Sequence, residues 1–269
     1  MAPRKISLVV SDVDGTLVDR VKTLTPAAIA AVRRLGEAGI GFAVISSRPP
    51  RGLAMLVEPL GLVTPLAGFN GGVITTTALE PLESHVLDAE AARRAVGTMA
   101  EAGADIWVFA GDEWLLRRPD GPYVPLERHT VEFEPRIVTE FGPSLERAAK
   151  IVGVSEDHDR LARIGLETAA MLGDAASVAR SQPYYLDVTP PHANKGAGVR
   201  ALARLAGVPL NEVAVIGDGE NDVPMFEAAG FAIAMGNAAP EVRAAAAAVT
   251  ESNDREGFAA AVERLLLDL

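Results

Sequence analysis

Two short acidic segments contain the residues of this sequence that are best suited to chemistry. The first, Asp12-Val13-Asp14-Gly15-Thr16, places two carboxylates two residues apart, directly after an apolar run at residues 6–10. In an extended segment, residues two apart point the same way, so both carboxylates can face one site. Asp-x-Asp also occurs in ordinary solvated turns. Its position after a buried strand favours a functional role, because ligands of open α/β sheets collect at the carboxyl ends of the strands.

The second segment is Gly217-Asp218-Gly219-Glu220-Asn221-Asp222, which also follows an apolar run. Three acids and an amide this close together would repel one another without a cation. Oxygen ligands of this kind beside a phosphate indicate Mg²⁺ rather than Zn²⁺. The alternatives are a solvated acidic loop or a calcium loop. The calcium pattern is not satisfied, because its ligand spacing and distal Glu are missing.

Two single residues occupy comparable positions. Ser46 ends an expected strand, where its hydroxyl and the backbone N–H groups that follow could hold a phosphate oxygen. Lys195 begins an expected helix and could supply a point charge to the same group. Alone, each residue is more often structural, as a cap or as a solvated lysine. Their positions at the ends of separate elements group them with the acidic segments.

The elements that must position these residues alternate between strand and helix. The first helix is expected to start after the cap Thr25-Pro26 and to end at Gly39. This alternation predicts an α/β fold whose core is a Rossmann-like, doubly wound parallel sheet. The further expected strands are residues 6–10, 40–45, 66–69, 212–216 and 231–235, and the further expected helices are residues 51–60, 195–206, 223–229 and 240–248.

The middle of the chain has a different character. It contains both Trp and all three Tyr, and its pattern predicts two helices, a hairpin and Pro-containing loops or edges. We therefore expect an inserted α+β cap at residues 82–187, with a core made of residues 1–81 and 188–269. The helices are expected at residues 88–102 and 157–172, the hairpin strands at 105–110 and 113–118, and the loops at 119–125 and 135–143.

Composition narrows the class of protein. Of the 269 residues, 25 are basic and 36 acidic, and the formal net charge of −11 argues against nucleic acid as a partner. The chain has no cysteine, which excludes disulfides, thiolate metal sites and Cys nucleophiles and fits a reducing compartment. The apolar run at residues 6–10 is too short for a secretory signal, and no run approaches the length of a membrane span. We expect a cytoplasmic protein without a membrane partner. The sequence does not specify an oligomeric state.

Together these segments resemble the four motifs of haloacid dehalogenase (HAD) superfamily phosphohydrolases, and the resemblance runs nearly end to end. Asp12-Val13-Asp14-Gly15-Thr16-Leu17 matches the first motif, Ser46 the second, Lys195 the third and Gly217–Asp222 the fourth. The usual Thr-Gly-Arg of the second motif is Ser46-Ser47-Arg48 here, which keeps the hydroxyl and adds a side chain near the site. The insertion resembles the C2-type cap of the Cof-type branch. The strings that resemble this branch are Asn70-Gly71-Gly72, Asn221-Asp222-Val223-Pro224-Met225, Ala234-Met235-Gly236-Asn237-Ala238 and Val249-Thr250 with Asn253 and Glu256-Gly257.

The resemblance implies a Mg²⁺-dependent phosphatase that hydrolyses a small phosphorylated metabolite, such as a sugar phosphate, through an aspartyl-phosphate. Asp12 would be the nucleophile and Asp14 the general acid and base. The metal residues implied are Asp12, Asp14 (through its backbone carbonyl), Asp218 and Asp222. The residues implied to bind the substrate phosphate are Ser46, Ser47, Lys195 and Asn221, with Arg48 as a candidate substrate contact.

Two other functions stay open on the same fold. A phosphoryl transferase or mutase would pass the phosphoryl group to a second substrate. A non-catalytic phosphometabolite-binding protein is disfavoured, because the four acids of the first and fourth motifs are all present. Weaker candidates for contacts with the leaving group, with a solvated surface as the favoured alternative for each, are Arg117, Arg118, Arg128 and His129. His192 could line the mouth of the cleft, but a plain loop residue is the favoured interpretation.

Overall fold

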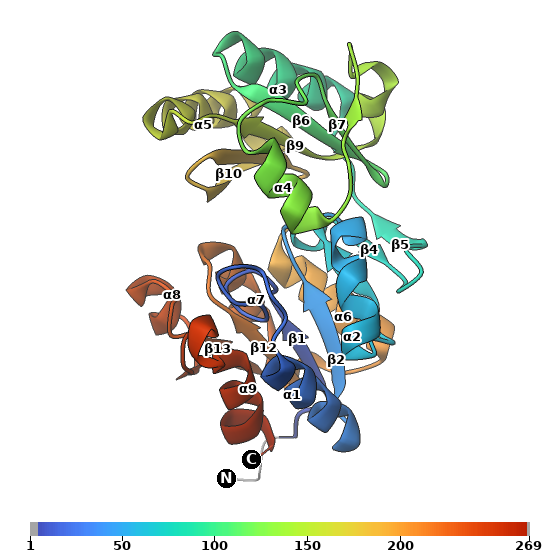
Figure 1. Cartoon of the computed structure of the whole chain (residues 1–269), viewed down its shortest axis with the longest axis vertical. Coiled ribbons are helices and arrows are strands. Elements are labelled where there is room, and N and C mark those ends of the chain that lie inside the picture. Colours follow the sequence, from blue (N-terminus) through green and yellow to red (C-terminus); the bar gives the residue numbers. More distant parts are fainter. Residues whose placement is uncertain (1–4, 268–269) are drawn as a thin grey trace.

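The computed structural model describes residues 5–267, which form two sheets with helices packed on them (Figure 1). The strands of the first sheet are β1 (Leu8–Ser11), β2 (Gly41–Ile45), β3 (Leu66–Gly68), β4 (Val73–Thr75), β5 (Pro81–Ser84), β12 (Val213–Gly217), β13 (Phe231–Ala234) and β14 (Ala248–Val249). Their order is β14-β13-β12-β1-β2-β3-β4-β5. The strands from β14 to β3 are parallel, and β4 and β5 join them antiparallel at one edge. The predicted parallel core is confirmed, and the antiparallel edge is an addition.

Helices cover both faces of this sheet. One face packs against α1 (Pro26–Glu37), α2 (Val57–Leu60) and α9 (Gly257–Ala261). The other face packs against α6 (Lys195–Ala206), α7 (Val223–Ala228) and α8 (Pro240–Ala244). The start of α1 follows the sequence prediction, because the Thr25 hydroxyl accepts a hydrogen bond from the Ala28 backbone N–H at 3.2 Å. The predicted doubly wound arrangement is therefore present.

Two predicted core helices differ from the structure. The sequence pattern predicts one helix over residues 51–60, but Pro50–Leu56 is a 3₁₀ segment that leads into α2. The alanine-rich helix expected at residues 240–248 ends at Ala244, and the chain then joins the sheet as β14. The Ala247 backbone N–H donates to the Ala232 carbonyl at 3.0 Å. Pairing with the sheet edge therefore outweighs the helix propensity of the alanines.

The second sheet is built from the middle of the chain. Its strands are β6 (Asp105–Ala110), β7 (Glu113–Leu116), β8 (Arg136–Ile137), β9 (Ala148–Val154), β10 (Ser177–Gln182) and β11 (Tyr185–Thr189), in the order β10-β11-β9-β6-β7-β8. Two helices, α3 (Ala89–Glu101) and α5 (His158–Leu172), cover the face away from the first sheet (Figure 1). The opposite face is aromatic and packs against α4 (Val124–Val131). The predicted hairpin and both predicted helices are present.

The structure corrects the expectation for residues 119–125, because α4 begins inside this Pro-containing stretch. Pro125 lies in the first turn of α4, where the missing N–H of proline costs nothing. The points where the chain changes sheet also lie a few residues beyond the expected boundaries. The first sheet keeps the chain through Ser84 in β5, and the second keeps it through Thr189 in β11. Residues 1–4 and 268–269 of the expected core lie outside the described part.

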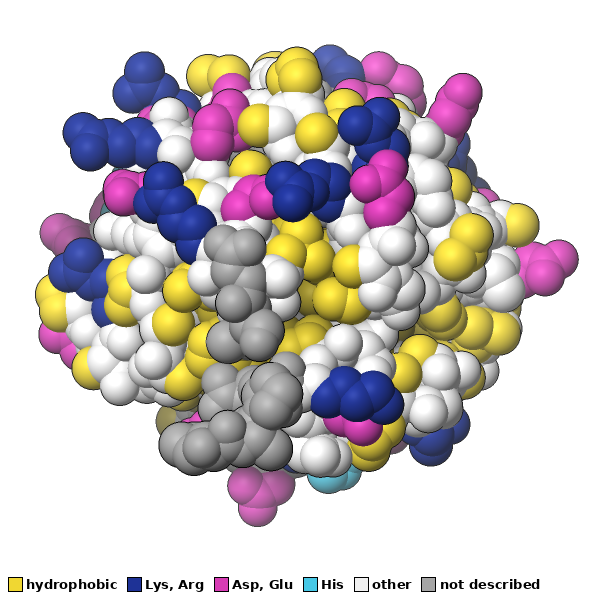
Figure 2. Space-filling model, turned by 90° about the horizontal axis from the view of Figure 1, so that it is seen from below, with side chains coloured by type: hydrophobic (Ala, Val, Ile, Leu, Met, Phe, Trp, Pro, Cys, Tyr) yellow, Lys and Arg dark blue, Asp and Glu magenta, His cyan; other side chains and the backbone are white. Residues whose placement is uncertain are grey.

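Within residues 5–267, short 3₁₀ segments and one π-helical segment make up the remaining helical structure. Figure 2 views the molecule from below the orientation of Figure 1, and it shows basic and acidic side chains interspersed on that face. Among residues 5–267, no helix combines the length and apolar character that a membrane crossing needs. The other 3₁₀ segments are Phe69–Gly71, Gly142–Arg147, Gly173–Ala175, Leu210–Glu212, Glu220–Asp222 and Asn253–Arg255, and the π-helical segment is Val262–Leu267.

Candidate active site

The candidate site lies at the carboxyl ends of three neighbouring strands of the first sheet. Asp12 follows β1, Ser46 follows β2 and Asp218 follows β12. These strands are adjacent in the order β12-β1-β2 and run parallel. Residues far apart in the sequence therefore meet at one edge, as expected for ligand sites of open α/β sheets.

Three carboxylates and one lysine form the centre of this site. Asp12, Asp218 and Asp222 each offer an oxygen, and these oxygens lie within 4.8 Å of one another. The Nζ of Lys195 lies 2.6 Å from Asp12 Oδ1 and also contacts Asp222. Lys195 and Asp222 are fully buried, and Asp12 is nearly so. One lysine leaves an excess of negative charge here, and carboxylate oxygens are the ligands that Mg²⁺ prefers, so the group fits that ion.

Asp222 organises the loop around this centre. Its Oδ2 accepts hydrogen bonds from the backbone N–H groups of Asp218 and Gly219, both at 2.8 Å. Its Oδ1 accepts from Lys195. A Cβ at Gly217 would lie 2.4 Å from Asp222 Cγ, so glycine is required there. Asp222 therefore holds both the loop and the lysine, and Asp12 and Asp218 have more capacity left for a metal.

Asp218 is positioned by residues from two other loops. The Thr16 hydroxyl donates to its Oδ1 at 3.2 Å, and Asn237 Nδ2 donates to its Oδ2 at 3.0 Å. Asn237 also donates to the Gly15 carbonyl at 2.9 Å. Gly15 has a φ of +83°, and a Cβ there would lie 2.2 Å from Asp218 Oδ2. The glycine of the first motif is thus needed both for its conformation and for the approach of Asp218.

The excess of negative charge appears in the pKa values. Burial raises the pKa of Asp12 well above its ordinary value, against the lowering influence of Lys195, and Asp222 and Asp218 raise it further. Burial and Asp222 raise the pKa of Asp218 to about 6. Burial alone would lower the pKa of Lys195, but Asp12 and Asp222 raise it. A divalent cation would relieve the repulsion among these acids.

Asp14 points to a different set of partners. Arg48 donates to both of its oxygens at 2.7 Å, and Lys22 Nζ lies 2.6 Å from Oδ1. Burial would raise the pKa of Asp14, but Arg48 and Lys22 lower it to about 2. Arg48 also donates to the carbonyl of Thr130, in α4, at 2.8 Å. One buried arginine therefore connects the second acid of the first motif to the second sheet.

The predicted phosphate ligands lie around this centre. Ser46 is fully buried, and its Oγ accepts from the Arg48 backbone N–H at 3.1 Å, which leaves the hydroxyl hydrogen available. Ser47 is half-buried beside it. Asn221 is exposed and donates to Asn70 Oδ1 at 3.1 Å. These side chains are therefore able to offer hydrogen bonds to an anion near Lys195.

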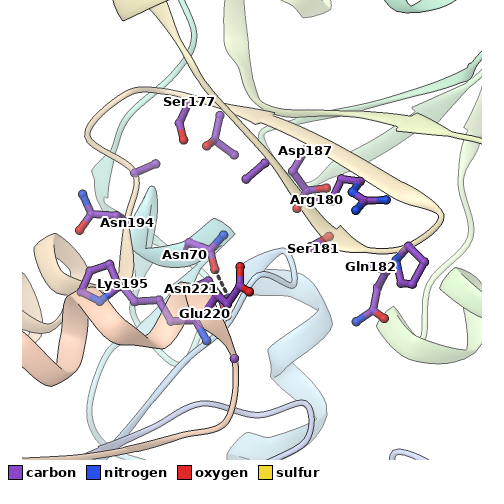
Figure 3. Close-up of a pocket in the computed structure, with 16 residues that line it drawn as sticks. Asn70, Ser177, Arg180, Ser181, Gln182, Asp187, Asn194, Lys195, Glu220 and Asn221 are labelled. Carbon is purple, nitrogen blue, oxygen red and sulfur yellow. Dashed lines mark hydrogen bonds between the residues drawn. The ribbon is translucent and has the colours of Figure 1, made fainter. Parts of the chain in front are cut away.

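A cavity of about 550 Å³ extends from Lys195 towards the second sheet. Figure 3 shows its two sides, and one of them carries Lys195 at the start of α6, its neighbour Asn194, and Asn70 and Asn221 from segments that follow strands of the first sheet. The facing side belongs to the hairpin β10–β11. The labelled side chains of that hairpin are Ser177, Arg180, Ser181, Gln182 and Asp187. This volume lies within the range of small-molecule sites.

The weaker candidates do not line this cavity. The three arginines among them pair with acids instead: Arg117 with Glu140, Arg118 with Asp105 and Arg128 with Glu134. His192 is exposed, and His129 lines a second cavity of about 360 Å³ that also contains Lys22 and Arg48. The structure therefore favours the solvated-surface interpretation for the three arginines.

Sequence reasoning missed several residues that the structure places in the site. The sequence could have identified Asn237 as a site residue, because it lies shortly after the strand β13, at the same edge of the sheet as the other motifs. Lys22, in a loop, gave none. Asp187 lay at the edge of the insertion, where only the pairing of β10 with β11 shows which way it faces.

Comparison with known proteins agrees with this site. The family model of haloacid dehalogenase-like hydrolases matches residues 9–262. A putative phosphatase of Haemophilus influenzae is 30% identical over 256 residues, which cover 95% of this chain and 96% of that protein. An HMP-PP phosphatase of Cronobacter sakazakii is 28% identical over 234 residues, 87% of this chain and 85% of that protein.

A solved structure gives the same result. The haloacid dehalogenase-like hydrolase from Bacteroides thetaiotaomicron superposes with a TM-score of 0.88 at 30% identity, covering 97% of this chain and 99% of that one. The resemblance indicated by the motifs is confirmed, and the chain belongs to the haloacid dehalogenase-like hydrolase family.

Proposed function

We propose that this protein is a Mg²⁺-dependent phosphatase that hydrolyses a small phosphorylated metabolite, such as a sugar phosphate, through an aspartyl-phosphate on Asp12. The observation that carries the proposal is the buried contact of Asp12 with Lys195 within a group of three carboxylates. Lys195 also lines the cavity, so a phosphate bound there would lie against the lysine that contacts Asp12. The names of the relatives, which are phosphatases, support the same reaction class.

The first step forms the covalent intermediate. A carboxylate oxygen of Asp12 attacks phosphorus, the bond between phosphorus and the ester oxygen breaks, and Asp14 gives a proton to the departing oxygen. Lys195 and the Ser46 hydroxyl stabilise the charge on the transferring phosphoryl oxygens. The paired Asp14 is ionised in this structure, so its action as an acid requires the release of Arg48 or Lys22 when substrate binds.

The second step returns the enzyme to its starting state. Asp14 takes a proton from water, whose oxygen attacks phosphorus and breaks the bond to Asp12. Inorganic phosphate leaves, and both carboxyl groups regain their original protonation. The sum is the hydrolysis of a phosphomonoester by one water molecule.

Asp12 and Asp218, with the backbone carbonyl of Asp14, are the residues that would hold Mg²⁺, and Asp222 would keep the loop in place. The cation supplies charge compensation between an anionic nucleophile and an anionic substrate. At about 4 Å that repulsion is about 4 kcal/mol for an effective dielectric near 20, or roughly a thousandfold in rate.

The second sheet limits the size of the substrate. Its β10–β11 hairpin lines one side of the cavity, whose volume suits a small metabolite, and we expect this hairpin to exclude a folded phosphoprotein. We therefore assign catalysis to residues 1–81 and 188–269 and substrate selection to the inserted cap of residues 82–187, with the change of sheet after Ser84 and after Thr189. The absence of cysteine supports a place in the cytoplasm.

A screen of phosphate release tests the proposed function. The protein is incubated with about a hundred phosphorylated metabolites, with Mg²⁺ or with EDTA. Metal-dependent release from one class of compound is the expected result. Release that EDTA leaves unchanged would contradict the metal assignment, and phosphate transfer to added alcohols instead of water would identify a transferase.

We expect added Mg²⁺ to stabilise the metal-free protein, prepared with a chelator, more at pH 7.5 than at pH 5. The raised pKa of Asp218, about 6, means that this group stabilises the fold below about pH 4 and loses that contribution as pH rises through 6. At pH 7.5 Asp218 has lost its proton, and bound Mg²⁺ would compensate the negative charge that the proton had neutralised. At ten times its Kd it contributes about 1.4 kcal/mol, which raises Tm by about 3–5 °C for a chain of this length.

Differential scanning fluorimetry checks this expectation, with KCl of equal ionic strength as the salt control. Asp218→Asn should reduce the shift at pH 7.5 to the value seen with KCl. An equal shift in this variant and in the wild type would contradict the assignment of Asp218 as a ligand.

Arg48→Met is expected to lower kcat by about 10- to 100-fold while KM changes less than about fivefold. Arg48 contacts Asp14 and Thr130 and does not line the larger cavity, so its loss misplaces the acid and base without removing a substrate contact. The pKa of Asp14, about 2 in the wild type, should rise, so an acidic limb should appear within pH 4–8 in the kcat profile of the variant. Steady-state kinetics over pH 4–8 measure both effects.

Two variants complete this test. Arg48→Lys keeps the charge but loses the bidentate contact with Asp14, so kcat should fall while the acidic limb of its profile moves less than in Arg48→Met. Arg33→Met, on the exposed face of α1, should have no effect. A rise in KM with an unchanged kcat would show instead that Arg48 contacts the substrate.

A further inference from the structure

Asp187 is a buried carboxylate that the catalytic steps do not use. In β11 the side chains alternate, and Leu186 and Val188 face the helices α3 and α5. Tyr185, Asp187 and Thr189 therefore face the other way, towards the first sheet. Asp187 is 4% exposed and lines the cavity that also contains Lys195 (Figure 3).

The carboxylate of Asp187 lacks the hydrogen bonds that a buried acid normally has. Within residues 5–267, neither of its oxygens accepts a hydrogen bond. Lys150, itself 6% exposed, has its Nζ 2.7 Å from Oδ2 and pairs with that oxygen, so Oδ1 is the oxygen left without a partner among the described residues. An unsatisfied buried acceptor is costly, so this arrangement indicates a partner that is supplied by a ligand.

The neighbourhood of the pair selects the chemistry of that ligand. Lys150 balances the charge of Asp187, so a neutral donor suffices. Glu127, in α4, lies near the same lysine, and burial raises its pKa against the lowering influence of Lys150. A ligand carboxylate placed against Asp187 would meet a group of the same charge whose lysine partner is already engaged. Hydroxyl groups donate hydrogen bonds and carry no charge, so they neither disturb the balance between Asp187 and Lys150 nor suffer repulsion from the acids.

The rest of the cavity points the same way. Its polar side chains are mainly hydroxyls and amides, and none of the residues that line it is aromatic. A heteroaromatic leaving group would therefore find no ring to stack on. Ser177 pairs with Thr189 across β10 and β11, next to the pair of Ala179 with Asp187, so two further hydroxyls lie beside the carboxylate. This side of the cavity is suited to several hydroxyl groups at once.

We propose that Asp187 is a specificity-determining residue that accepts hydrogen bonds from the hydroxyl groups of an aldose or alditol monophosphate. The inference rests on the proposed phosphatase function and narrows its substrate class. The phosphate lies at the Lys195 end of the cavity, and the polyhydroxylated chain extends to the Asp187 end. A site built to hydrogen-bond a hydroxyl discriminates strongly against analogues that lack it.

The test compares substrates within one enzyme. Aldose and alditol monophosphates of three to six carbons are assayed beside p-nitrophenyl phosphate, pyridoxal 5′-phosphate and 3-phosphoglycerate. The readout is the ratio of kcat/KM for the best polyhydroxylated substrate to kcat/KM for p-nitrophenyl phosphate. Asp187→Ala is expected to lower this ratio by about 10- to 100-fold. Asp105→Ala, which removes an acid of the same sheet outside this cavity, should leave it unchanged.

A second variant guards against a folding defect. Asp187→Leu combined with Lys150→Met replaces the buried pair with apolar groups, a change that folds often tolerate. It should lower the ratio as Asp187→Ala does. Monodeoxy analogues of the best substrate then locate the contact. The analogue that loses the most in the wild type should lose little in Asp187→Ala, because the two changes remove the same hydrogen bond.

The outcomes separate the two proposals. An unchanged ratio in both variants, or a wild-type preference for pyridoxal 5′-phosphate or 3-phosphoglycerate, would overturn the role of Asp187 and leave the phosphatase intact. Equal loss on every analogue would also overturn it, as a purely structural effect. No turnover of any compound, p-nitrophenyl phosphate included, would overturn the phosphatase function itself.

Discussion

Asp12→Asn is expected to lower kcat for metal-dependent phosphate release by at least about a thousandfold. The amide is a poor nucleophile, so the covalent route is lost. The fold should survive, because Lys195 keeps its contact with Asp222. Burial and the neighbouring acids raise the pKa of Asp12, so its charge destabilises the metal-free fold, and the variant should melt at the wild-type temperature or above it.

The measurement is phosphate release from p-nitrophenyl phosphate with saturating Mg²⁺, beside a thermal melt. Asp174→Asn makes the same chemical change on an exposed part of the cap and should retain full activity. A residual rate above about a tenth of the wild-type rate, in a variant that melts normally, would remove Asp12 from the role of nucleophile.

The residues at the centre of the site could be predicted because each of them lies next to the sequence pattern that positions it. Asp12, Ser46 and Asp218 each follow an apolar strand directly, and the strand order that brings them together follows from the alternation of strands and helices. The side chain of Asp222 is used within its own loop, so the motif itself contains the contact. Each of these inferences used only a strand and the residues that directly follow it, so the sequence was sufficient.

The cap side of the site could not be predicted in the same way. The contact between Arg48 and the Thr130 carbonyl joins residues 82 positions apart. It also depends on α4, and the prolines at the start of that helix favoured a loop in the sequence prediction. Asp187 and Lys150 meet only because β11 pairs with β9 in one particular register. A shift of one residue would turn Asp187 towards the helices, and no local pattern records that choice.

Removing Lys195 should have the largest combined effect on stability and activity. Lys195→Met leaves the buried Asp12 and Asp222 without their shared cation, and the loss of one partner of a buried pair costs about 3–5 kcal/mol. The stabilisation by Lys195 is present at all working pH values, because its pKa is raised. The transferring phosphoryl oxygens also lose a positive charge, so kcat should fall by at least about a hundredfold.

Protonation and metal should each repair the fold of Lys195→Met. Without the lysine the pKa of Asp12 rises further, so the deficit in unfolding free energy relative to the wild type should shrink as pH falls from 8 to 5. Mg²⁺ should recover part of the loss at pH 7.5, and adding Asp12→Asn should recover part of it by removing one of the charges. Urea unfolding measures these differences, with Lys5→Met as the exposed lysine control. If the deficit were independent of pH, metal and Asp12, Lys195 would contribute through packing rather than through the charge balance on which the proposed mechanism depends.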